Sequence, residues 1–202
     1  AKTSEFNYVK NAPAYSGLKK RKYTVEKPDI EILQIKTERL DSLITCEEKI
    51  DFIKIDVEGG EFDVLKGAEA LLKRDQPIVI FECGLGSSEF YDTKPSELYR
   101  FLSKFNYKLY TLSGFIKKKN PLQEVDFEKI YNNNSEYYFI VEAKWAINYS
   151  SGAWIPNFSI KSFSSFTYTA SDGNKKSMFL TLNAVSTSTT SICTIAPGVS
   201  SL

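Results

Sequence analysis

Four carboxylates cluster in the sequence around the ends of two short hydrophobic segments. Asp56, Glu58 and Glu61 follow the first of these segments, and Glu82 ends the second. Carboxylates this close to apolar segments cost free energy unless they are paired, hydrogen-bonded or bound to a metal. The chemistry open to them is proton abstraction or coordination of a hard divalent cation.

The composition narrows this chemistry further. The chain of 202 residues contains no histidine, which excludes Ser-His-Asp and Cys-His nucleophile systems and the HExxH zinc site. Any general base must therefore be Asp, Glu, Lys, Tyr or a metal-bound water. The three cysteines form no CxxC pair, so neither a disulfide framework nor a structural zinc site is indicated. We expect Cys83 to be a buried thiol.

Charge and hydropathy exclude two classes of partner. The net charge of +1 provides no field for non-specific nucleic-acid binding. No apolar run approaches the roughly 20 residues that span a bilayer, and no signal-peptide pattern stands at the start. We therefore expect a cytoplasmic protein with no nucleic-acid partner and no membrane span. The chain begins at Ala1 and its only methionine is Met178, so either processing removed its start or it is a piece of a longer protein.

Strand and helix patterns alternate through the first part of the chain. The patterns predict strands at 30–36, 52–57, 77–82, 107–112 and 137–141, and helices at 37–44, 62–72 and 95–105. This order predicts an α/β fold, with a mostly parallel sheet, helices on both faces and an antiparallel edge pair. Ligands of such folds bind beyond the carboxyl ends of the parallel strands, where the four carboxylates are expected to converge.

The composition shifts abruptly near Trp145. Residues 145–202 are rich in Ser and Thr and hold only four charged residues, Lys161, Asp172, Lys175 and Lys176. This shift predicts a boundary between residues 1–144 and an extension over 145–202. Short β segments are expected at 163–168 and 178–182 around a turn at 172–174, and so small a hairpin must dock to be stable. The extension is a small β appendage, a lineage-specific addition or a stretch translated in the wrong frame.

The segment 50–68 carries a family resemblance. Its sequence, IDFIKIDVEGGEFDVLKGA, resembles the signature segment of the FkbM-type methyltransferases. Residues 39–43 resemble the "LDSL" element of that family, and residues 77–82 resemble the strand that follows. Residues 15–21 are similar, more weakly, to its Ser-Gly loop. The resemblance covers most of residues 5–144.

The resemblance implies a Rossmann-like class I methyltransferase sheet and the cofactor S-adenosylmethionine. The family usually methylates a hydroxyl of a sugar, a glycan or a polyketide-like product. The strand at 51–57 would be the fourth of the sheet, the strand at 78–82 the fifth, and the last two strands an antiparallel pair. Asp56 would face the junction of cofactor and acceptor. Asp56 and Glu82 are the expected catalytic residues, either as proton acceptors or as ligands of a divalent metal ion.

Further contacts follow from the same resemblance. Cofactor contacts are expected from Asp56 and Glu58, and acceptor contacts from Glu61, Tyr15 and Arg21. Two more tyrosines, Tyr91 and Tyr110, are candidates for the wall of an acceptor pocket.

One departure from the family concerns the cofactor. The family binds it with a glycine-rich loop after the first strand and an acidic residue after the second, and both lie upstream of the segment where this chain begins. The glycines at 59–60 and at 84 and 86 follow the wrong strands for that role. The resemblance therefore implies an N-terminally truncated sheet, comprising the C-terminal two-thirds of the domain. It implies an unpaired edge on the strand at 51–57 and no cofactor binding by this chain alone.

Alternatives remain open for each of these residues. Glu58 and Glu61 are suited to capping the first turn of the helix that follows them. Glu82 is suited to an ion pair with Lys54. The basic run at 19–22 is either a solvated loop or a contact for a phosphate or an acidic sugar.

Two other function classes compete with a methyltransferase. In a non-catalytic binding or interaction module, the carboxylates would be purely structural. A metal-dependent hydrolase would use them as ligands, although they lack a recognisable two-metal spacing.

Overall fold

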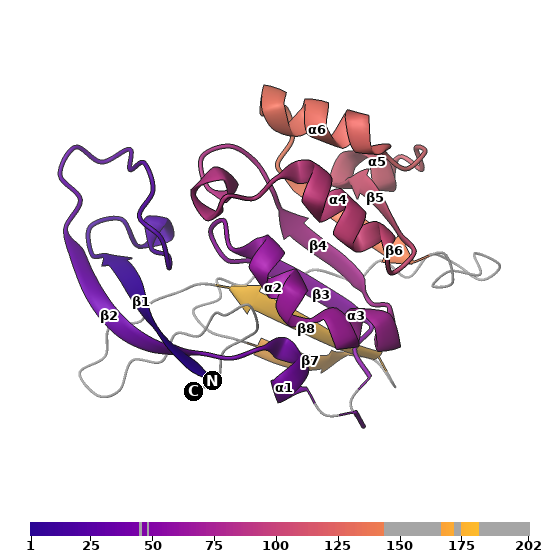
Figure 1. Cartoon of the computed structure of the whole chain (residues 1–202), viewed down its shortest axis with the longest axis horizontal. Helices are drawn as coiled ribbons and strands as arrows, with labels where there is room; N and C mark the ends of the chain where they lie inside the picture. The colour runs from indigo at the N-terminus through magenta and orange to yellow at the C-terminus, as the bar shows by residue number, and fades with distance from the viewer. Residues whose placement is uncertain (45, 48, 144–166, 172–174, 182–202) are drawn as a thin grey trace.

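A computed structural model describes residues 1–44, 46–47, 49–143, 167–171 and 175–181. These residues form a two-stranded sheet and a six-stranded sheet, which lie side by side in Figure 1. No helix among them is long and apolar enough to cross a membrane.

The smaller sheet is an antiparallel arm. It pairs β1 (Lys2–Val9) with β2 (Ile30–Thr37), in a register that runs from Lys2 opposite Thr37 to Val9 opposite Ile30. The predicted strand at 30–36 is confirmed, whereas β1 was not predicted because polar residues fill most of its first half. A long connection joins the two strands and contains the short helix η1 (Pro13–Tyr15).

The larger sheet has the strand order β5-β6-β4-β3-β8-β7. Its strands are β3 (Phe52–Asp56), β4 (Ile78–Glu82), β5 (Tyr107–Thr111), β6 (Tyr138–Ala143), β7 (Thr167–Ser171) and β8 (Lys175–Thr181). β3 pairs in parallel with β4 and β8, and every other pairing in the sheet is antiparallel. The α/β class and the antiparallel pair β5–β6 are confirmed. The prediction of a mostly parallel sheet is wrong for the described strands, because the pairings β4–β6, β5–β6 and β7–β8 are antiparallel and only two are parallel.

The expected open edge of the sheet is also corrected by β8. Residues Ser177–Thr181 pair with Phe52–Asp56, so the edge of β3 that was expected to be unpaired carries a strand. An uncovered edge presents free N–H and C=O groups that favour pairing with any strand within reach, and the tail supplies one. The predicted turn at 172–174 and residues 163–166 lie outside the described residues. The division into 1–144 and 145–202 remains a prediction.

The helices follow the strands in alternation. They are α1 (Leu40–Leu43), α2 (Glu61–Gly67), α3 (Glu69–Asp75), α4 (Pro95–Ser103), α5 (Leu112–Ile116) and α6 (Glu124–Asn133), together with the short helix η2 (Ser88–Tyr91). The predicted helix at 62–72 is two helices that meet at Ala68, and α5 and α6 were not predicted.

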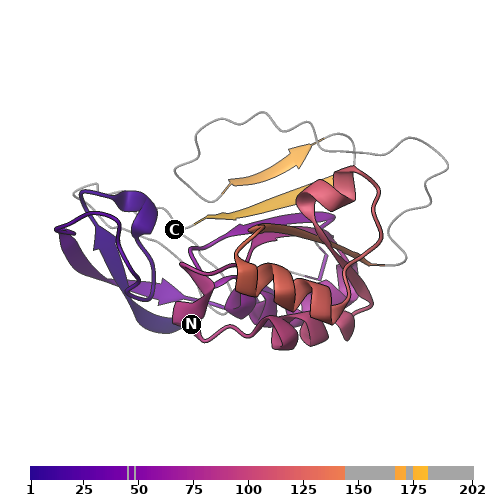
Figure 2. The same cartoon turned by 90° about the horizontal axis from the view of Figure 1, so that it is seen from above.

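The helices do not cover both faces of the larger sheet equally. In Figure 2, α2, α3, α4 and α6 lie together on one face. On the other face, Phe115 of α5 packs against Tyr110 of β5, with ring centroids 5.4 Å apart. Helical cover of both faces was predicted, but within the described part of the chain the second face is covered by α5 alone.

The two faces of the sheet differ in chemistry because side chains alternate along each strand. The face toward the helices carries fully buried apolar residues, namely Ile53, Ile55, Val79, Phe81, Phe139 and Val141. The Phe139 ring lies 6.1 Å from Phe81 and 4.9 Å from Phe127 of α6, measured between centroids. The opposite face carries the polar residues Lys54, Asp56, Glu82 and Tyr138, none of them fully buried, together with the buried apolar residues Phe52 and Ile140. The core therefore fixes the strands, and the open face presents the polar side chains.

Candidate functional site

A row of polar side chains crosses the open face at the carboxyl ends of the parallel strands. Asp56 ends β3, Glu82 ends β4, and Tyr138 on β6 is the registered partner of Glu82. The predicted convergence of the carboxylates is seen in their electrostatics. Burial raises the pKa of Glu58, and the nearby Asp56 and Glu82 raise it further. Asp56, Glu58 and Glu82 therefore share one region of the molecule.

Asp56 is held by a lysine of its own strand. The Lys54 ammonium forms an ion pair with the Asp56 carboxylate, two residues further along β3. Both side chains are partly buried, so this pair is better shielded than a surface pair. The partner of Lys54 is thus Asp56 rather than Glu82. A carboxylate beside an ammonium group can accept a proton from a bound hydroxyl.

Glu82 lies beside Tyr138, its register partner on β6. The interaction with Glu82 is the main cause that raises the pKa of Tyr138 to about 12, and burial and the nearby charges of Asp56 and Glu58 add to the shift. Tyr138 therefore stays neutral at physiological pH.

Glu58 connects the strand end to the arm. It adopts a left-handed backbone conformation with φ of 57°, and its carboxylate pairs with Arg21 at 2.8 Å. Arg21 also donates to the Ala14 carbonyl at 2.8 Å, and its guanidinium lies 4.9 Å from the centre of the Tyr15 ring. Burial raises the pKa of Glu58, and Arg21 opposes that rise. The predicted acceptor residues Tyr15 and Arg21 thus lie together on a loop that is anchored to Glu58.

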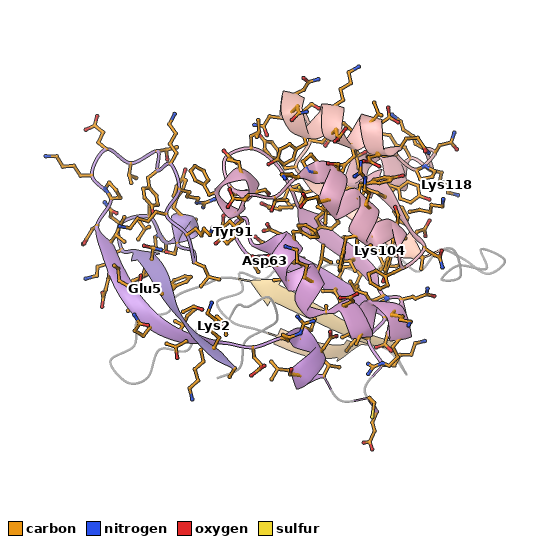
Figure 3. All side chains as sticks on the ribbon, in the orientation of Figure 1. Lys2, Glu5, Asp63, Tyr91, Lys104 and Lys118 are labelled. Carbon is orange, nitrogen blue, oxygen red and sulfur yellow. The ribbon has the colours of Figure 1, made fainter. Side chains whose placement is uncertain are left out.

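Tyr91 is a second anchor of the same loop. Its hydroxyl accepts a hydrogen bond from the Lys19 backbone N–H at 3.3 Å, and Figure 3 shows it between the arm and α2. Burial raises the pKa of Tyr91 to about 12. Tyr110, the other candidate tyrosine, instead donates to Glu142 at 3.1 Å, further along the open face. Of the two, only Tyr91 lies beside the carboxylates.

Glu61 shapes the turn after β3 from inside the protein. It is 2% exposed, and its Oε1 accepts the backbone N–H groups of Val57 and Gly59, both at 3.1 Å. Glu61 thus satisfies free backbone N–H groups, as the capping alternative predicts, and its contact with an acceptor stays a prediction. Burial raises the pKa of Glu61 to about 7. Its Oε2 is buried without a hydrogen-bond partner among the described residues.

Cys83 follows Glu82 but contributes no nucleophile. It is 1% exposed, which confirms the predicted buried thiol. Burial raises the pKa of this thiol to about 12, and the thiolate needed for attack is therefore disfavoured.

The residues of this site do not fit the whole cofactor. One acid-x-Gly-x-Gly spacing does occur, at residues 82–86, but it follows β4. A Cβ atom on Gly84 would lie 2.8 Å from the Tyr137 ring, so this glycine makes room for a tyrosine. The described part of the chain thus lacks a glycine loop placed to hold an S-adenosylmethionine molecule.

The site does not fit a divalent metal ion either. Lys54 already forms an ion pair with the Asp56 carboxylate, and Tyr138 interacts with Glu82. Among the residues that the structure describes, no group of three or more acidic or Cys side chains is arranged to hold a metal ion.

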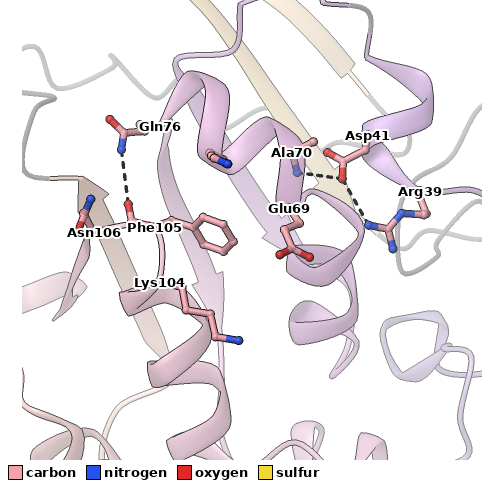
Figure 4. Close-up of a pocket in the computed structure, with 9 residues that line it drawn as sticks. Arg39, Asp41, Glu69, Ala70, Gln76, Lys104, Phe105 and Asn106 are labelled. Atoms are coloured by element: carbon pink, nitrogen blue, oxygen red, sulfur yellow. Dashed lines mark hydrogen bonds and ion pairs between the residues drawn. The ribbon is translucent and has the colours of Figure 1, made fainter.

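A surface pocket lies at the opposite end of the sheet. Its volume is about 550 Å³, and it opens near the amino ends of β4 and β5 (Figure 4). Asp41 lines it, and the carboxylate of Asp41 accepts the N–H groups of Ala70 at 3.0 Å and Leu71 at 2.9 Å. The "LDSL" residues therefore cap α3, and none of the predicted site residues lines this pocket.

The comparisons with known proteins bear on this arrangement. A model of the methyltransferase FkbM domain matches residues 3–109. A search of curated proteins and a search of solved structures gave no match. The matched residues include the arm, β3, β4 and all six predicted site residues, and they make up more than half of the chain. The chain therefore belongs to the family defined by the methyltransferase FkbM domain.

Proposed function

We propose that this chain forms the acceptor side of an S-adenosylmethionine-dependent O-methyltransferase with a Rossmann-like sheet. Its acceptor would be a hydroxylated small molecule or a glycan. The observation that carries the proposal is the Asp56 carboxylate, held by Lys54 on the open sheet face next to Glu82. When bound, S-adenosylmethionine supplies an electrophilic methyl group. The residues of this chain then have to orient the acceptor hydroxyl and remove its proton.

The pair of Lys54 and Asp56 suits the removal of that proton. Asp56 would accept the proton of a hydrogen-bonded acceptor hydroxyl as the acceptor oxygen takes the methyl group, the bond from that methyl carbon to the sulfonium sulfur breaks, and the neutral thioether leaves. The Lys54 ammonium keeps the carboxylate in place and offsets negative charge on the acceptor oxygen. A positioned general base contributes about 10²–10⁴-fold to the rate, and alignment of the reacting atoms contributes the rest.

Cofactor binding tests the assignment directly. We would titrate S-adenosylmethionine calorimetrically into the 202-residue chain and into a form extended at its N-terminus by roughly 80–100 residues, enough for two strand–helix units. Binding by the extended form alone is expected, because the missing glycine loop would then be supplied. Binding by neither form would contradict a methyltransferase and favour a non-catalytic binding module.

Replacement of the proposed base tests the mechanism. In the extended form, Asp56→Asn should lower methyl transfer by about 10²-fold or more at unchanged cofactor affinity. The matched control is Asp63→Asn, which removes a carboxylate of α2 that is 40% exposed and paired with Lys66. Equal turnover of Asp56→Asn and the control would remove Asp56 from the catalytic role.

A further inference from the structure

The surface pocket near the amino ends of β4 and β5 has no part in the proposed function. Its volume of about 550 Å³ is ordinary for a small-molecule site, for which roughly 300–1,000 Å³ is usual. We propose that this pocket binds a small molecule that carries an anionic group, such as a phosphate, next to a flat apolar ring. The inference does not rest on the proposed function, because none of the carboxylates at the strand ends lines the pocket.

Cations from three separate elements line this pocket. Arg39 precedes α1, Lys73 belongs to α3, and Lys104 directly follows α4. Neither Lys73 nor Lys104 forms an ion pair with any residue that the structure describes. Cations gathered around one cavity repel each other, and an anion between them removes that repulsion. The pocket therefore suits an anionic group.

The acidic residues of the pocket do not neutralise these cations. The Asp41 carboxylate is already engaged, since it accepts two backbone N–H groups of α3, at 3.0 and 2.9 Å, and pairs with Arg39 at 3.4 Å. Among the lining residues, the one other acid is Glu69. Three cationic and two anionic side chains leave the lining with an excess of one positive charge. This excess favours an anion over a neutral molecule.

The Phe105 ring provides an apolar wall beside these charges. In Figure 4 it projects into the space between Lys104 and Glu69. The residue is partly buried, and its ring packs edge-on against Phe101 of α4, with the ring centroids 5.2 Å apart. A ring that is held in this way can stack on a flat ring of a ligand. The wall and the cations together favour a ligand whose anionic group adjoins such a ring.

Two amide side chains add polar contacts to the same pocket. They belong to Gln76, before β4, and to Asn106, before β5, and both residues have a left-handed backbone, with φ of 50° and 63°. The Gln76 amide donates to the Phe105 carbonyl at 3.5 Å, so it links the end of α3 to the end of α4. The Asn106 amide has no hydrogen bond to another described residue and is available to a ligand. An apolar wall with a few placed polar groups is the usual composition of a small-molecule site.

Amide-resolved NMR on the 202-residue chain tests the proposal. The probe is phenyl phosphate, which has both groups. The comparison compounds are inorganic phosphate, which has no ring, and benzyl alcohol, which has no charge. Phenyl phosphate should bind most tightly of the three and should shift the backbone amide signals of Lys73, Gln76 and Asn106. The signals of Asp56 and Glu82 should stay in place, which distinguishes this pocket from the candidate site.

Single substitutions separate the contributions of charge and ring. Lys73→Gln and Lys104→Gln should each weaken phenyl phosphate binding by roughly five-fold, since each removes one cation beside the anionic group. Phe105→Leu keeps an apolar side chain next to Phe101 and should weaken phenyl phosphate binding about five-fold, with the binding of inorganic phosphate unchanged. The matched control is Lys129→Gln, which removes an exposed lysine of α6 outside the pocket and should bind as the wild type does.

Three results would overturn this inference. They are the absence of shifts at the pocket amides with phenyl phosphate, equally tight binding of inorganic phosphate, and a loss of binding in Lys129→Gln as large as in Lys73→Gln and Lys104→Gln. Cofactor titration of the extended form reports on the proposed function alone, so the two proposals can fail independently.

Discussion

At the scale of single residues, Glu61 in the turn after β3 makes the stability of the protein depend on pH. Its pKa is about 7 in the folded protein, against 4.5 for an ordinary Glu side chain, because burial disfavours the charged form. The folded state therefore binds an additional proton between these values. Stability should fall as pH rises from about 5 to about 7, by up to roughly 3 kcal/mol in total.

Glu61→Gln should abolish this pH dependence. The amide stays neutral, and its oxygen can still accept the N–H groups of Val57 and Gly59. In urea denaturation at pH 5, 6, 7 and 8, the variant should keep a nearly constant free energy of unfolding over the range in which the wild type declines. Asp63→Asn is the control, since its carboxylate is exposed, and it should follow the wild type. A decline of equal size in Glu61→Gln would assign the pH dependence to other groups.

Sequence patterns located some site residues and missed others for physical reasons. Asp56 and Glu82 were predicted to converge because both end hydrophobic strands, and strand ends of a parallel pair meet at one edge. The burial of Glu61 could not be predicted, since it depends on how α2 packs under the turn. The position of Tyr138 beside Glu82 was missed as well, because the two residues are partners on neighbouring strands and far apart in the sequence.

At the scale of elements, the turn from β3 into α2 depends on Gly59. Its φ is +108°, and a Cβ atom there would lie 2.6 Å from the Ser87 carbonyl oxygen and 2.9 Å from the Tyr91 ring. Gly86 is a natural comparison, with φ of +106° and no atom within 4 Å of its virtual Cβ. The two glycines share backbone strain and differ in available space.

Gly59→Ala should therefore destabilise the protein more than Gly86→Ala does. The Gly86 variant bears only backbone strain, about 1–3 kcal/mol, whereas the Gly59 variant adds a collision with the Ser87 backbone. Urea denaturation of both variants at one pH measures the difference. Equal losses of stability would show that the η2 segment moves aside without cost.

The arm contacts the rest of the protein through apolar side chains such as Phe6 and Ile35, which belong to the common hydrophobic core, and through the ion pair of Arg21 and Glu58. The Arg21 side chain is 11% exposed and the Glu58 side chain 23%. Removal of one partner leaves the other partly buried charge uncompensated, so each single variant should lose more stability than an exposed pair would.

A double-mutant cycle of Arg21→Ala and Glu58→Gln measures this pair. A coupling free energy of roughly 1–3 kcal/mol is expected, with faster tryptic cleavage after Lys20 or Lys22 in the Arg21→Ala variant as the loop loses its anchor. The exposed pair of Lys94 and Glu97 is the reference and should show a coupling below about 1 kcal/mol. Additive effects at Arg21 and Glu58 would mean that the apolar contacts of the arm and the Tyr91 hydrogen bond hold the arm without help from this pair.

Helices and strands differed in how far local patterns revealed them. The buried strands β3 and β4 were predicted within a residue or two, since continuous apolar runs mark them. α6 was missed although Gln123 and Asp126 form a capping box at its start, a local signal that could have revealed it. β1 has no comparable signal, because its pairing with β2 is what makes it a strand.

At the scale of the whole molecule, β8 completes the sheet from the far end of the chain. Its pairing with β3 joins residues more than 100 positions apart, and no local pattern reveals such a partner. The composition shift near residue 145 indicated a separate extension, but not that its strands would continue the sheet.

A chain shortened to residues 1–143 tests this pairing. The β3 edge should then be free, so the backbone amides of β3 that face β8 should exchange with deuterium faster, while those that face β4 stay protected. The shortened chain should also self-associate more at equal concentration, as measured by sedimentation. Leu180→Pro in the full chain is the matched variant, because it removes one backbone donor within β8. Unchanged exchange in both would contradict the β3–β8 pairing.

The loop of the arm has a consequence for how such proteins diversify. Among the described strands, β1 and β2 pair only with each other, and their connecting loop contacts the candidate site through the Arg21 side chain and the Lys19 backbone. Insertions or exchanges in that loop leave the ladder between β3 and β4 intact. New surfaces beside the candidate site can therefore evolve by exchange of one hairpin tip, while the carboxylates at the strand ends are inherited unaltered.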